Sequence, residues 1–177
     1  MQSEYLFELG GENKELAKTE ALELLKTEDY RPKKGFEEDQ IAIIKVSKEL
    51  TLKTIQRLGM TKRVSKIILS SGQKNIWKVI EQLPLLELGK SSFAIRQICK
   101  NEVSERKIAV KIGEKISIDN KIDLDNPDVK ILFYTGSRTI ISILEENSTT
   151  SYKICLKHHV RYRPYFSPIS IHPRIAR

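Results

Sequence analysis

The sequence predicts an α+β fold that is divided into two consecutive units. Segments typical of strands and helices alternate along residues 1–71 in the order β-α-β-β-α-β, and a second mixed set of helices and strands follows from residue 72. The 177 residues are enough for one domain or two small ones. Hydrophobic residues make up 40% of the chain and charged residues 31%, which is the balance of a globular protein.

The first unit has the element order of a ferredoxin-like split βαβ fold, in which helices cover one face of an antiparallel sheet. Ala, Leu, Glu and Lys dominate its first helix, and these residues favour helices. The predicted elements are a strand within 3–11, a helix at 12–29, a hairpin at 29–47 whose clearest strand is 41–46, a short helix at 50–58 and a strand at 64–70.

The second unit is predicted from the helical and strand periods of its apolar residues. In its longer helix Ile108, Ile112 and Ile116 form one apolar stripe, and Ser104 is the expected N-cap. The predicted elements are a short helix at 75–83 that Pro84 ends, a strand within 91–101, the helix at 104–118, and strands at 129–134, 138–146 and 149–158.

An acidic turn precedes the strand at 129–134. Pro127 fixes its own φ and keeps Asn126 out of the helical region, so the turn sends the strand off in a defined direction. Asn126 and Asp128 are of the types that bond nearby backbone N–H groups. We expect Asp128 to be partly buried and hydrogen-bonded.

Charge is distributed unevenly along the chain. Residues 1–40 carry a net charge of −5, which leaves +13 for the remainder of a chain whose total is +8. The residues from 151 onward include six Lys or Arg and no acid. This asymmetry favours a polyanionic partner such as nucleic acid, although a lysine-rich surface that only aids solubility fits the composition equally well.

Other classes of function find little support. No apolar run reaches membrane-spanning length and no signal peptide opens the chain, so we expect a cytoplasmic protein without a membrane partner. Cys99 and Cys155 lack metal-ligand spacing with the histidines and are expected to be reduced thiols. The sequence predicts no metal site, and no nucleotide-binding glycine motif or catalytic triad is recognisable.

The segment around the acidic turn resembles the signature of the THUMP domain, an RNA-binding module of tRNA-modifying enzymes. Ile122, Leu124, Pro127 and Asp128 match its hydrophobic-x-Leu-x-x-Pro-Asp pattern, which leads into a strand. The preceding strand is similar too, at Phe93, Arg96 and Lys100. A ferredoxin-like unit usually precedes this module.

The tail resembles the linker of archaeal tRNA guanosine-10 N2-methyltransferases; the matching residues are Arg163, Pro164, Phe166, Ser170, His172, Pro173, Ala176 and Arg177. The resemblance implies a ferredoxin-like domain at 1–71, a THUMP domain at 72–158 and a linker at 159–177. A Rossmann-type methyltransferase domain that binds S-adenosylmethionine would follow, and this chain does not include it. We therefore expect no cofactor and no catalytic site here, in a chain that is part of a tRNA methyltransferase.

The candidate RNA contacts are the cations of the second unit and the tail: Arg96, Lys100, Lys107, Lys111, Lys115, Lys153, Lys157, Arg161 and Arg163. Lys107, Lys111 and Lys115 recur every four residues and are predicted to share one helix face. With few aromatic residues, contacts to phosphates and RNA shape are expected more than base reading. The resemblance implies binding at the tRNA acceptor stem and 3′ end. Three alternatives stay open: a 4-thiouridine synthetase, a pseudouridine synthase, or a separate adaptor for a methyltransferase subunit.

Overall fold

The structure is a computed structural model. It describes residues 3–10, 13–72, 76–88, 91–98, 105–116, 120–145, 150–152 and 154. These residues form an α+β fold, as predicted, with seven named strands and four named helices.

The chain separates into two compact units. One consists of residues 1–64 together with 147–177, and the other of residues 65–146. The division falls within strand β4 (Thr61–Ser71), which contributes residues to both. The domain assignments 1–71, 72–158 and 159–177 stay predictions.

The first unit has the predicted order of elements. These are β1 (Ser3–Leu9), α1 (Lys14–Thr27), β2 (Lys33–Glu38), β3 (Ile41–Val46), α2 (Leu52–Gln56) and the start of β4. The strands lie in the order β2-β3-β1-β4, and β3 pairs antiparallel with both β1 and β2. A hairpin thus joins β2 to β3, as its turn-rich sequence predicted.

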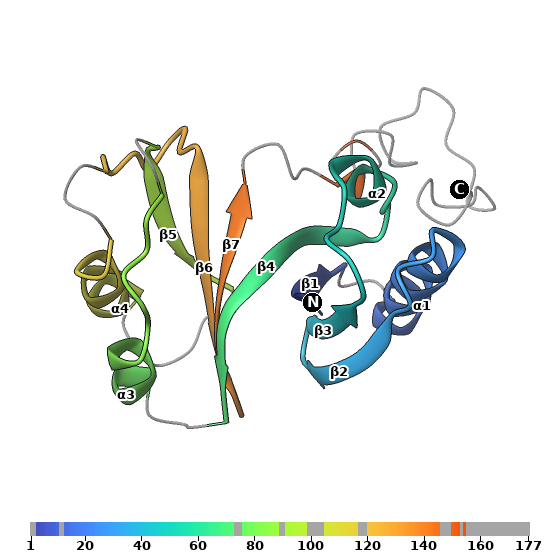
Figure 1. Ribbon diagram of the computed structural model, residues 1–177, viewed down its shortest axis with the longest axis horizontal. Helices are drawn as coiled ribbons and strands as arrows, with labels where there is room; N and C mark the ends of the chain where they lie inside the picture. Colours follow the sequence, from blue (N-terminus) through green and yellow to red (C-terminus); the bar gives the residue numbers. More distant parts are fainter. Residues whose placement is uncertain are drawn as a thin grey trace, which may run out of the picture. The chain divides into compact units, whose positions relative to one another are not determined.

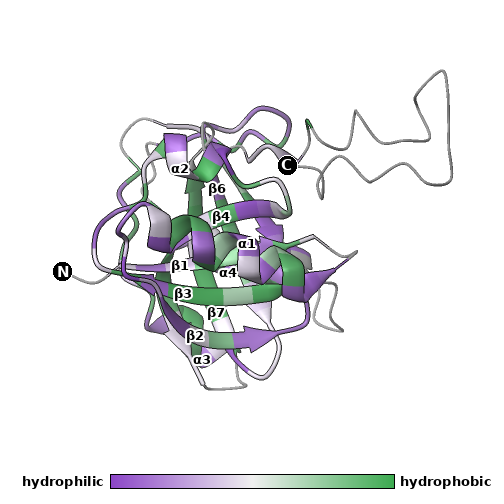
Figure 2. Ribbon diagram, turned by 90° about the vertical axis from the view of Figure 1, so that its right-hand side faces the viewer, coloured by the Kyte–Doolittle hydropathy of each residue, from purple (hydrophilic) through white to green (hydrophobic). Residues whose placement is uncertain are grey.

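The core of the first unit lies between its helices and one face of the strands. Ala17, Ala21 and Leu25 of α1 pack with alternate residues of the strands, among them Phe7 and Ile44. The side chain of Asn13 caps α1 by accepting a hydrogen bond from the Leu16 N–H at 3.0 Å. Strand β3 is hydrophobic along most of its length, whereas β2 carries hydrophilic segments (Figure 2).

The second unit combines β4 with α3 (Ile76–Glu81), β5 (Phe93–Gln97), α4 (Glu105–Gly113), β6 (Val129–Thr135) and β7 (Thr139–Glu145). Its strands lie in the order β4-β7-β6-β5. The pairs β4–β7 and β6–β7 are antiparallel, and β5 is parallel to β6. Helices α3 and α4 lie beside each other next to these strands (Figure 1). The predicted isoleucine stripe is confirmed on the helix at Ile108 and Ile112, which are buried in the core. Ile116 is buried there too, but it lies beyond the end of α4.

Two elements differ from prediction. Helix α4 ends at Gly113 and not near residue 118, since a glycine and a turn at 114 and 115 interrupt the helical bonds. Ile116 then forms a bridge with Leu86. The strand predicted at 149–158 is wrong at Tyr152 and Ile154, which are helical.

The failed strand has a tertiary cause. The Thr150 hydroxyl donates to the Lys62 carbonyl at 3.0 Å, and the Ser151 hydroxyl donates to the Gln56 carbonyl. These contacts with α2 and β4 anchor the segment and override its strand propensity. No helix among the described residues is long and apolar enough to cross a membrane.

Candidate nucleic-acid interface

The acidic turn is held by an aspartate that the sequence pattern did not single out. Oδ1 of Asp123 accepts hydrogen bonds from the N–H groups of Asp125 and Asn126, both at 2.9 Å. Pro127 is buried beneath the turn. This bonding of an aspartate to the backbone two residues ahead is an Asx turn. Within the turn, the N–H groups of Asp125 and Asn126 are therefore capped by Asp123, whereas Asp128 bonds to Ser92.

Asp128 is hydrogen-bonded as predicted, but its expected partial burial is wrong. It is exposed, and its Oδ2 accepts from both the N–H and the hydroxyl of Ser92 at 2.8 Å. The Asp128 N–H donates in return to the Ser92 hydroxyl oxygen at 3.1 Å. The backbone and side-chain bonds from Ser92 hold the pKa of Asp128 below its usual value. The carboxylate thus joins the start of β6 to the start of β5, at the surface.

Residues 121–123 lie along the outer edge of β5. The Phe93 N–H donates to the Lys121 carbonyl at 2.9 Å, and the Phe93 carbonyl accepts from the Asp123 N–H at 3.0 Å. Phe93 therefore bridges Ile122 as it would a strand partner. Leu124 follows, and the side chains of Ile122 and Leu124 are left 72% and 58% exposed. Two neighbouring large apolar side chains thus form a small exposed apolar patch on a segment whose backbone is held by hydrogen bonds.

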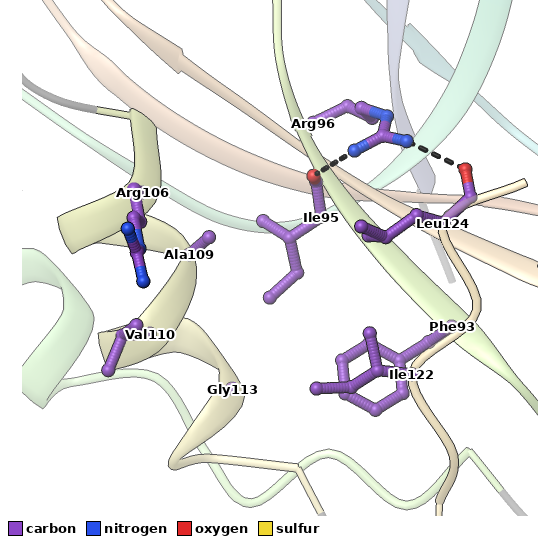
Figure 3. A pocket seen from close by; sticks show the side chains of 9 residues that line it. All are labelled: Phe93, Ile95, Arg96, Arg106, Ala109, Val110, Gly113, Ile122 and Leu124. Atoms are coloured by element: carbon purple, nitrogen blue, oxygen red, sulfur yellow. Dashed lines mark hydrogen bonds between the residues drawn. The ribbon is translucent and has the colours of Figure 1, made fainter.

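An apolar cleft of about 690 Å³ opens between α4, β5 and this edge segment (Figure 3). Its lining is Phe93, Ile95, Arg96, Arg106, Ala109, Val110, Gly113, Ile122 and Leu124. The two arginines are the charged members of the lining. Arg96 is partly engaged, because Nη2 donates to the Leu124 carbonyl at 2.7 Å and Nη1 lies 3.5 Å from the Ile95 carbonyl. Its remaining N–H groups give it capacity for a further acceptor.

The predicted lysine stripe on α4 is only partly assembled. Lys107 and Lys111 are exposed on the helix, but Lys115 lies in the turn beyond it, with Nζ 3.5 Å from the Glu81 carbonyl. Lys111 pairs with Glu114 at 2.8 Å. Among the described residues, Lys107 has no ion-pair partner. Lys100, Lys153, Lys157, Arg161 and Arg163 lie outside the described residues.

A second groove, of about 610 Å³, lies between α3 and α4. Trp77, Arg106, Lys107, Val110 and Lys111 line it. Trp77 and Arg106 were not among the predicted contacts, although Trp77 is the single tryptophan of the chain and Arg106 precedes Lys107. Arg106 lines both hollows, so the two are adjacent on α4. Within the described ranges, no group of His, Cys, Asp or Glu could hold a metal ion.

Neither family models nor curated protein sequences match this chain. Solved structures match its fold. A possible methylase from Clostridium difficile 630 is 13% identical with a TM-score of 0.61, over 81% of this chain and 41% of that one. TrmN from Thermus thermophilus is 14% identical with a TM-score of 0.52, over 79% and 45%. A 4-thiouridine synthetase in complex with RNA and ATP is 15% identical with a TM-score of 0.52, over 82% and 42%.

These similarities establish the fold. The chain spans between 41% and 45% of the length of the three solved chains. It shares with them an architecture of strands and helices.

Proposed function

We propose that this chain is the tRNA-binding region of a tRNA-modifying enzyme. The observation that carries the proposal is the exposed cationic face of α4, on which Arg106 lines the apolar cleft and Lys107 lines the adjacent groove. A 4-thiouridine synthetase with the same fold was solved in complex with RNA, which supports the assignment to RNA. Other chains of this fold are described as a possible methylase and a putative methyltransferase, which supports a modifying enzyme.

The geometry suits contacts with the phosphate backbone of RNA. Phosphate oxygens are bound by exposed guanidinium and ammonium groups, which release counterions from the RNA when they bind. Arg106 presents a planar fork for such oxygens, and Lys107 a mobile point charge. The apolar cleft alongside them offers a surface on which an unpaired 3′ end can lie while the acceptor stem follows the cations.

The finer proposal is that the modification is N2-methylation of a tRNA guanine. It rests on the resemblance of the tail segment and on the methylases of the same fold. The cleft itself does not fit S-adenosylmethionine, because its lining contains no carboxylate for the ribose hydroxyls. The methyl donor would therefore be held by a separate catalytic domain, and this chain would place the tRNA for it.

Deleting the gene in its source organism and analysing bulk tRNA nucleosides by mass spectrometry distinguishes the candidates. Loss of N2-methylguanosine supports the methyltransferase. Loss of 4-thiouridine, or of a pseudouridine, assigns the chain to one of the alternative enzymes. An unchanged nucleoside profile would contradict a role in tRNA modification.

Binding by the isolated chain is tested by titrating labelled tRNA at several salt concentrations. The double substitution Arg106→Ala/Lys107→Ala is expected to lower the slope of log K against log salt by about 1.4–1.8, because each phosphate contact contributes about 0.7–0.9. The matched control is Lys33→Ala/Lys34→Ala, which removes two exposed charges from β2. Equal slopes for the two variants would show that the α4 cations are a solvated surface only.

A further inference from the structure

The groove between α3 and α4 exposes the only tryptophan of the chain. Ile76, Val79 and Ile80 of α3 are buried in the second unit, which is the spacing of a core-facing helix stripe. Trp77 lies off that stripe and is 39% exposed. An indole offers a broad flat apolar face, and Trp is found at sites where such a face meets a partner.

The charged side chains that line the groove are of one sign. Of the five side chains that line the groove, Arg106, Lys107 and Lys111 are cations, and none is an acid. Glu114 offsets the charge of Lys111 from outside the lining. Among the residues that the structure describes, Arg106 and Lys107 have no ion-pair partner. The groove therefore joins one flat apolar face to two uncompensated positive charges.

We propose that this groove binds an unpaired nucleotide of single-stranded RNA, whose base stacks on Trp77 and whose phosphate contacts Arg106 and Lys107. This inference rests on the proposed function and assigns it a base-stacking subsite. A base stacked on an aromatic ring beside cations is the general way in which single strands are bound without sequence preference. The volume of about 610 Å³ lies in the range of small-ligand sites, roughly 300–1,000 Å³, which suits one or two nucleotides.

An acidic peptide is the competing occupant, and the lining argues against it. A carboxylate matches the cations but brings no flat apolar surface to pack on the indole. A nucleotide supplies both the anion and the planar ring at adjacent positions. Because Arg106 also lines the apolar cleft, a strand that occupies the groove can continue into the cleft without leaving α4.

The single tryptophan makes the subsite directly observable. The intrinsic fluorescence of the intact chain is titrated with a tetra-adenylate oligoribonucleotide, and stacking is expected to quench it. Trp77→Leu keeps apolar bulk but removes the ring, and anisotropy of a labelled oligonucleotide should show roughly a five- to tenfold loss of affinity. Trp77→Phe should recover part of it. Lys107→Ala should instead lower the salt slope by about 0.7.

Matched controls lie in the same unit. Leu85→Ala removes a side chain that is 64% exposed and lines neither hollow, and Lys78→Ala removes an exposed cation of α3 that does not line the groove. Both should bind the oligonucleotide as the unaltered chain does. Circular dichroism verifies that every variant is folded.

The outcomes separate this inference from the proposed function. If tRNA binds but tetra-adenylate leaves the fluorescence unchanged, or Trp77→Leu and Trp77→Phe both bind like the unaltered chain, the stacking subsite is refuted and the RNA-binding function stands. Equal quenching by polyglutamate also refutes it, since a peptide then fills the groove. If tRNA itself fails to bind at any salt concentration, the proposed function is wrong.

Discussion

Glu20 provides a sharp test of how the first unit is held together. It lies on α1, and its two carboxylate oxygens accept the N–H groups of Gly59 and Met60, each at 2.9 Å. Gly59 and Met60 are buried at the end of the loop that leads into β4. The substitution Glu20→Ala would leave both N–H groups without their acceptor.

The expected loss follows from those two groups. A buried donor that loses its partner costs about 1–3 kcal/mol. Because water can reach part of the gap left by the side chain, we take the lower half of this range for each and expect about 2–4 kcal/mol in the free energy of unfolding. At an m-value of about 2 kcal/mol per molar urea, the midpoint falls by about 1–2 M.

Glu23→Ala is the matched control, because Glu23 lies on the same helix but pairs with Lys26 at the surface, where both side chains are more than half exposed. Its effect should stay within about 0.5 kcal/mol. Urea titrations followed by circular dichroism give the midpoints, and hydrogen exchange of the Gly59 and Met60 amides gives the local effect. If the Glu20 and Glu23 variants unfold at the same urea concentration, the carboxylate does not anchor this loop.

Two further predictions concern the strands. Gly35→Ala in β2 would place a Cβ 2.9 Å from the Ile43 carbonyl oxygen, so it should destabilise the first unit by about 1–3 kcal/mol. At Gly72 an added Cβ meets open space, so Gly72→Ala should not destabilise the chain. Equal urea midpoints for the two variants would contradict the contact at Gly35. Asp128→Asn should reduce the loss of unfolding free energy that occurs as the pH is lowered into the acid range. Because Ser92 lowers the pKa of Asp128 in the folded chain, the carboxylate stabilises above the ordinary aspartate pKa, and this stabilisation is lost as the pH falls through the lowered value. Urea midpoints measured from about pH 7 to about pH 3 test it, and parallel profiles for the two proteins would refute it.

Local patterns were sufficient to predict most elements of the fold. Strand β3 and helix α1 have strong periods and favourable residues, so neighbours in sequence determine their conformation. The segment at 149–158 has strand-forming residues as well, but Thr150 and Ser151 are bonded to backbone groups more than 80 residues away. A single sequence gives no sign of such a partner.

The candidate site likewise has features that depend on local sequence and features that depend on distant contacts. The apolar stripe of α4 was predictable, and the pairing of Lys111 with Glu114 is also visible at a spacing of three residues. The exposure of Trp77 was not predictable, because it depends on where α4 packs against α3. The hydrogen bonding of Asp128 was predicted but its exposure and its partner were not, since Ser92 lies 36 residues away in the sequence.

Two of the acidic side chains of the turn, Asp123 and Asp128, have a structural role beside the basic surface. Asp123 and Asp128 accept hydrogen bonds from backbone or hydroxyl groups, and in doing so they fix residues 121–124 along the edge of β5. Arg96 completes the attachment through the Leu124 carbonyl. Ile122 and Leu124 are consequently held exposed at one wall of the cleft, while Arg106 of α4 lines the other wall. A turn without these side-chain acceptors would keep the backbone bonds between the edge segment and Phe93, but it would lose the bonds of Asp123 and Asp128 that hold the apolar wall in place.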